Sequence, residues 1–78
     1  MRLISEIAKD IRAEWGAKVN YAAKPYLDAM RCIDMPGDNF GYDDSKDVVL
    51  RFLCNASSFR GERARELKRE LKAIFNIE

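Results

Sequence analysis

Apolar residues recur at three- and four-residue intervals in four stretches of the chain, and this periodicity predicts α-helices. The first stretch predicts a helix over about residues 2–15, with Gly16 placed to end it. The inner face of this helix consists of Leu3, Ile4, Ile7, Ala8, Ile11 and Trp15. No stretch alternates apolar and polar residues at every second position, which is the pattern of a half-buried strand.

A second helix is predicted to end near Cys32, and two starts are open. Asn20 can cap a helix that begins directly after it. Pro25 then lies only about five positions into the helix, where a missing amide costs little. Alternatively, the helix begins at Pro25, after a separate turn over residues 19–23. A loop of about ten residues, 34–43, follows. Pro36 and Gly37 stand there at the central positions of a type II turn.

The third helix is predicted to run to about Ala56, with Asp43, Asp44 or Ser45 as its cap. Its apolar residues cover more than half of its circumference, which is typical of a central, buried helix. These residues are Val48, Val49, Leu50, Phe52, Leu53 and Ala56.

A fourth helix is predicted from a cap at Ser58 through Phe75, with an inner stripe that includes Ala64, Leu67 and Leu71. The fold prediction is therefore all-α. Residues 1–78 form a single small domain of about four helices, packed around the central third helix.

The amino-acid composition argues against several classes of function. The 14 basic and 13 acidic residues leave a net charge of +1, which argues against a dedicated nucleic-acid coat. Histidine is absent, so imidazole-based catalysis and histidine metal sites are excluded. A cysteine nucleophile would lack its usual base, and Cys32 and Cys54 are expected to be reduced residues that pack at helix margins. The chain is predicted not to be an enzyme, with no catalytic residues.

The acidic loop over residues 34–43 supplies several carboxylates, which are the ligands of a calcium site. A calcium-binding EF-hand loop needs acids at alternating positions. Counting from Asp34 puts Pro36 at the third position, and counting from Asp38 puts Phe40 there. The spacing does not fit, so neither a metal nor a cofactor is expected.

Cellular location follows from the absence of two patterns. Glu6 interrupts the apolar run that a signal peptide needs. No apolar stretch approaches the ~20 residues of a membrane-spanning helix. The expectation is a cytoplasmic protein without a membrane partner.

The fourth helix carries the clearest charge pattern. Four basic residues project onto one outward sector: Arg65, Lys68, Arg69 and Lys72. Glu62 with Arg65 and Glu66 with Arg69 have the i,i+3 spacing of surface ion pairs. The sector therefore has two interpretations, a salt-bridged solvent face or a contact for an anionic partner.

Unlike charges are segregated along the chain, and this predicts a protein-binding surface. Residues 34–47 hold five acids and one lysine, whereas residues 58–78 hold six basic residues and four acids. A partner protein is expected at the surface that joins the loop aromatics Phe40 and Tyr42 to the basic sector. Self-association through these unlike patches is a further expectation.

Nucleic-acid binding is the alternative function. The third and fourth helices resemble a helix-turn-helix in outline. The contacts would come from Arg60, Arg63, Arg65, Lys68, Arg69 and Lys72. Against this interpretation, the first turns of the fourth helix contain no Asn or Gln to read adenine.

Two segments, residues 21–30 (YAAKPYLDAM) and 52–65 (FLCNASSFRGERAR), carry a resemblance to a known family. The chain resembles short uncharacterised proteins encoded by bacteriophages and integrated mobile elements of bacteria. Many members have Trp where this chain has Phe59. The resemblance implies no activity and no functional residues. It implies a small cytosolic protein of a mobile genome, a setting in which compact domains often bind and block a host protein such as a defence nuclease.

Overall fold

The structure is a computed structural model that describes residues 2–35, 37, 39–40 and 43–77. The four α-helices of this part of the chain are α1 (Ile4–Trp15), α2 (Lys24–Met30), α3 (Ser45–Cys54) and α4 (Glu62–Ile74). The shorter elements are the 3-10 helix η1 (Gly16–Lys18) and the antiparallel strands β1 (Asn39–Phe40) and β2 (Asp43–Asp44). The predicted all-α class is confirmed. The sequence predicted no strand because a two-residue pair leaves no alternating pattern.

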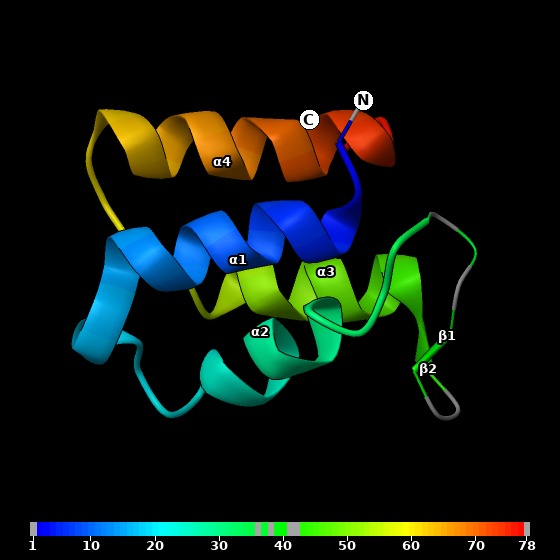
Figure 1. Cartoon of the computed structure of the whole chain (residues 1–78), viewed down its shortest axis with the longest axis horizontal. Helices are drawn as coiled ribbons and strands as arrows, with labels where there is room; N and C mark the ends of the chain where they lie inside the picture. The colour runs from blue at the N-terminus through cyan, green and yellow to red at the C-terminus, as the bar shows by residue number, and fades with distance from the viewer. Residues whose placement is uncertain (1, 36, 38, 41–42, 78) are drawn as a thin grey trace.

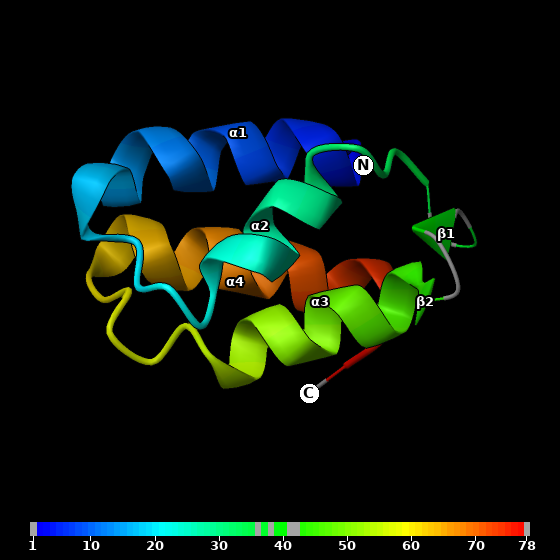
Figure 2. The same ribbon diagram turned by 90° about the horizontal axis from the view of Figure 1, so that it is seen from below.

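Successive helices run in opposite directions along the long axis of the molecule (Figure 1). In this view α2 and α4 lie on opposite sides of α1. The view turned by 90° places α1 and α3 on opposite sides of α2 (Figure 2). The topology is that of an up-down-up-down bundle, with residues 16–23, 31–44 and 55–61 as the connections between successive helices. The strand pair lies at the end of the bundle where α3 begins.

One hydrophobic core fills the bundle. The sequence predicts that this core is centred on the third helix, and among the described side chains Phe52 of α3 is the largest that is fully buried. However, α1 is the helix that packs against both α2 and α4. In the same way α2 packs against both α1 and α3, so the packing of the helices is not centred on α3 alone.

An aromatic cluster joins three segments of the chain within this core. The Trp15 ring stacks on the Phe59 ring, with 4.9 Å between centroids and 22° between planes. The rings of Trp15 and Phe52 meet edge to face, with 6.2 Å between centroids and 78° between planes. Offset stacking and edge-to-face contact are the favoured arrangements of aromatic pairs. Phe59 thus anchors the connection between α3 and α4 to the end of α1.

This anchor corrects the predicted start of the fourth helix. The helix begins at Glu62 and not after Ser58, since the chain first turns inward to bury Phe59. Gly61 precedes the helix with φ +113°, a conformation that side chains other than glycine rarely adopt. The glycine was therefore the local signal for the true helix start.

Asn20 decides how the second helix begins. Its Oδ1 accepts a hydrogen bond from the Ala23 amide at 2.8 Å, and the turn leads into α2 at Lys24. Its Nδ2 donates to the Asn55 carbonyl at 3.0 Å, which joins the α1–α2 and α3–α4 connections. Both open alternatives were partly right. Asn20 caps the turn, and Pro25 stands in the first turn of the helix.

The start of α3 is fixed by two side chains. Asp44 is the cap, and its Oδ1 accepts a hydrogen bond from the Asp47 amide at 2.9 Å. Ser45 is buried, and its Oγ accepts a hydrogen bond from the Gly37 amide at 3.0 Å. The predicted turn at Pro36 lies outside the described residues.

The prediction for the cysteines was wrong in one respect. Cys32 and Cys54 are free thiols, but both are exposed and do not pack into the core. Cys32 lies just beyond the end of α2, and Cys54 is the last residue of α3. Helical projection is unreliable at such ends, because the chain leaves the helical path there.

Candidate functional site

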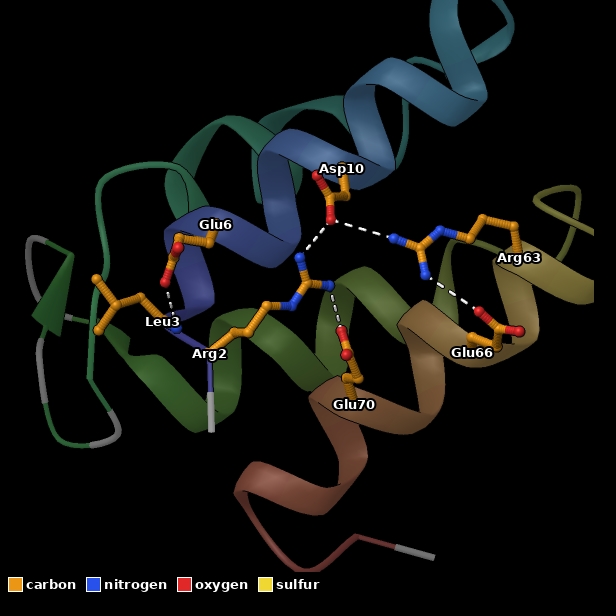
Figure 3. A network of polar contacts seen from close by, with 7 residues as sticks. All are labelled: Arg2, Leu3, Glu6, Asp10, Arg63, Glu66 and Glu70. Carbon is orange, nitrogen blue, oxygen red and sulfur yellow. Dashed lines mark hydrogen bonds and ion pairs between the residues drawn. The ribbon is translucent and has the colours of Figure 1, made fainter.

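A network of ion pairs joins α1 to α4. We call its residues the seam: Arg2, Asp10, Arg63, Glu66 and Glu70. The guanidinium of Arg2 donates to Asp10 of α1 and to Glu70 of α4 (Figure 3). Arg63 joins the same Asp10 at 3.2 Å and Glu66 at 3.1 Å. Asp10 therefore accepts from two arginines, and the carboxylates of Glu66 and Glu70 are both engaged on the α1 side of α4.

This seam changes the charge pattern that the sequence predicts for α4. The i,i+3 pair that forms in the described structure is Arg63 with Glu66, and not the predicted Glu66 with Arg69. The predicted pair of Glu62 with Arg65 is likewise not among the ion pairs of the described residues. The spacing of residues along α4 could not show this difference, because Arg2 and Asp10 lie in another part of the chain. Arg2 binds the Glu70 carboxylate, and Asp10 binds Arg63.

The seam gives a pH-dependent contribution to stability. The hydrogen bond from Arg2, together with the charges of Arg2 and Arg63, holds the pKa of Asp10 below its usual range despite some burial. A depressed pKa in the folded state adds stability above the ordinary carboxyl range. That stability is lost as the pH falls through the folded-state value.

Asp10→Asn should therefore flatten the pH dependence of the unfolding free energy below about pH 4. The expected amplitude is about 0.2–1 kcal/mol, since the paired side chains are partly exposed. Urea unfolding at a series of pH values measures it. Glu14→Gln removes an exposed carboxylate that is in no ion pair with a described residue, and it should leave the slope unchanged. If both variants reduced the pH dependence of the unfolding free energy equally, the ion pairs of Asp10 would not be its cause.

The opposite flank of α4 carries cations that the domain does not neutralise. Arg65 and Arg69 are exposed, and Lys72 is partly exposed. None of the three forms an ion pair with a described residue. We call Arg65, Arg69 and Lys72 the cationic stripe. The carboxylates of Glu66 and Glu70 are held by the seam, whereas exposed Glu62 lines a depression with Arg65 and Arg69 without forming an ion pair with either. The stripe therefore presents an excess of positive charge to solvent.

Lys68 was predicted in the same outward sector, but its ammonium group is used inside the domain. Its Nζ donates to the carbonyls of Ala56 and Phe59 at 2.8 and 2.6 Å, and lies 5.7 Å from the Phe59 ring centroid. Burial, reinforced by the charges of Lys72 and Arg60, lowers the pKa of Lys68. The primary role of Lys68 is therefore to hold the α3–α4 connection.

A shallow groove of about 450 Å³ runs beside the cationic stripe. Ala73 and Ile77 provide its apolar lining, and Lys68 contributes to one wall. Ile77 was not among the predicted site residues. The groove thus combines an apolar lining with a row of unpaired positive charges.

A Schellman motif places Ile77 in this groove. Asn76 has φ +54°, its amide donates to the Ala73 carbonyl at 3.3 Å, and the Ile77 amide donates to the Lys72 carbonyl at 2.8 Å. These two bonds turn the chain back, so that Ile77 lines the groove with Ala73. The signal in the sequence was the asparagine just after the last apolar residues of the helix.

The other predicted contact residues separate in the structure. Tyr42 lies outside the described residues, and the backbone alone is described for Phe40. Arg63 belongs to the seam. Arg60 is exposed, and its Nε donates to the Ser57 carbonyl at 3.2 Å. Of the predicted residues, the groove therefore brings together Arg65, Lys68, Arg69 and Lys72.

The α3–α4 pair differs from a helix-turn-helix. In that motif two helices cross at about 90–120° after a turn of about 3–4 residues. Here α3 and α4 run in opposite directions, and residues 55–61 connect them. The first turn of α4 is therefore not presented as a recognition helix would be.

The described part of the chain offers neither a metal site nor a membrane-spanning helix. No group of three or more cysteine, aspartate or glutamate side chains there is arranged to hold a metal ion. Its helices are all too short or too polar to cross a membrane.

Comparisons of the chain with protein-family models, with curated proteins and with solved structures found no match in any of the three. The class that the fold and the site define is an all-α, four-helix domain with a cationic groove along its last helix.

Proposed function

We propose that the protein is a non-catalytic protein-binding module that uses the cationic stripe of α4 to hold an acidic surface of a partner protein. The observation that carries this proposal is the division of charge around α4. Of its carboxylates, Glu66 and Glu70 are bound by Arg63 and Arg2 on one flank, and Glu62 in its first turn is in no ion pair among the described residues. On the other flank Arg65, Arg69 and Lys72 are also left without an ion pair among the described residues, so positive charge is in excess there.

An acidic protein fits this surface better than a nucleic acid for two reasons. Ala73 and Ile77 give the groove an apolar lining, which a phosphate backbone cannot use but an aliphatic side chain can. The net charge of +1 also provides little long-range attraction for a polyanion. Nucleic-acid binding through the stripe and Arg60 is the alternative.

The resemblance to phage and mobile-element proteins provides the proposed setting. In it the module is cytoplasmic, and its partner is a host or phage protein, for instance a host defence protein that it inhibits. A second copy of the chain is the other partner to consider. Its exposed acids Asp44 and Asp47 at the start of α3 are opposite in charge to the stripe.

A salt titration separates the two classes of partner. Contact with about four phosphates should give log affinity a slope of about −3.6 against log salt for duplex DNA. We expect no gel shift with mixed-sequence duplex or single-stranded DNA at low salt, and we expect capture of an acidic protein from bacterial extract. A salt-dependent shift of that slope, lost in Arg65→Glu/Arg69→Glu, would overturn the proposal in favour of nucleic acid.

A further inference from the structure

The spacing of the cationic stripe matches the repeat of an α-helix. Arg65, Arg69 and Lys72 stand at i, i+4 and i+7 and so form a straight row along α4. At a rise of about 1.5 Å per residue, the row spans about 10 Å along the helix axis. A second helix packed alongside would present its own i, i+4 and i+7 residues at the same intervals.

The apolar part of the groove continues from this row. Ala73 follows Lys72 directly, and Ile77 lies where the Schellman turn brings the chain back. An aliphatic side chain one turn beyond a row of carboxylates could therefore cover Ala73 and Ile77. A ligand that matches the groove therefore needs a row of acidic residues and, beyond it, an aliphatic residue; negative charge alone is not enough.

We infer that the occupant of the groove is an acidic helix of the partner protein, with carboxylates at i, i+4 and i+7 and an aliphatic residue one turn beyond them. The inference rests on the proposed function and names the partner's structural class. Acidic residues are expected because they complement the charge of the unpaired stripe. A helix is expected because its residues repeat at the intervals of the stripe. An aliphatic residue is expected because Ala73 and Ile77 give the groove an apolar lining.

Two synthetic peptides of identical composition test this inference by fluorescence anisotropy at low salt. Both are held helical by side-chain bridges. One carries glutamates at i, i+4 and i+7 with leucine one turn beyond each end of the row. The other scatters the same residues around the helix. We expect the ordered peptide to bind at least about tenfold more tightly, a difference of about 1.4 kcal/mol. Ile77→Ser should remove most of that advantage, and Arg65→Glu/Arg69→Glu should abolish binding of both peptides.

Equal affinity of the two peptides, or no binding of either, would overturn the inference, because the groove would then not recognise an ordered helix. Tighter binding of a linear polyglutamate than of the ordered peptide would overturn it in favour of an extended acidic chain. These results differ from failure of the proposed function. That failure would be a natural partner whose binding survives Arg65→Glu/Arg69→Glu.

Discussion

Replacing Phe52 by alanine is expected to lower the free energy of unfolding by about 3–5 kcal/mol. Phe52 is fully buried, and its ring is in edge-to-face contact with Trp15, which in turn stacks on Phe59. The substitution opens a cavity in a core shared by α1 and α3 and removes one partner of the aromatic cluster. Small domains have a free energy of unfolding on the order of 5–10 kcal/mol, so this loss would be a large fraction of the stability of the domain.

Urea unfolding followed by circular dichroism measures the effect of Phe52→Ala. Tyr21→Ala is the control, because Tyr21 is a large aromatic side chain that is 91% exposed. That change should stay within about 0.5 kcal/mol of the unmodified protein. A loss below about 1 kcal/mol for Phe52→Ala would contradict the described core.

Reversing two charges of the cationic stripe, Arg65→Glu/Arg69→Glu, is expected to weaken partner binding by about 2–5 kcal/mol where the contact is desolvated. This corresponds to about 30-fold or more in affinity. The reason is that the variant places carboxylates where the partner's acids lie. Arg65 and Arg69 are exposed and in no ion pair with described residues, so the fold should be retained.

The matched control is Lys9→Glu/Lys24→Glu, which changes the net charge by the same amount on the α1–α2 side. Both lysines are exposed and line a different surface depression. Isothermal titration with the captured partner should show near-normal affinity for this variant. Equal weakening in the two double variants would mean that net charge, and not the stripe, governs binding.

The helices could be predicted from the sequence because their apolar spacing is local information. The i,i+3 and i,i+4 repeats in residues 4–15 and 62–74 place the core faces directly. The start of α4 was misplaced because Ser58 looks like a cap, whereas burial of Phe59 against Trp15 is a contact between distant segments. Serine is a common cap only where tertiary packing permits it.

The site was predictable in part for the same reason. Arg65, Arg69 and Lys72 share one sector of a helix, so their projection alone brings them together. The role of Lys68 depends on carbonyls of the α3–α4 connection, and the seam depends on Arg2 near the other end of the chain. Such non-local partners decide which charges remain free, and spacing along one helix cannot show them.

The central claim is that the cationic stripe of α4 is the surface that binds a partner protein. The most direct measurement is a map of backbone amide chemical-shift changes in the ¹⁵N-labelled domain as the captured partner is added. The account predicts that the largest changes fall on Arg65, Arg69, Lys72, Ala73 and Ile77, with little change along the α1–α2 face. Changes concentrated on Lys9, Lys24 and the rest of that face, with the stripe unaffected, would contradict it.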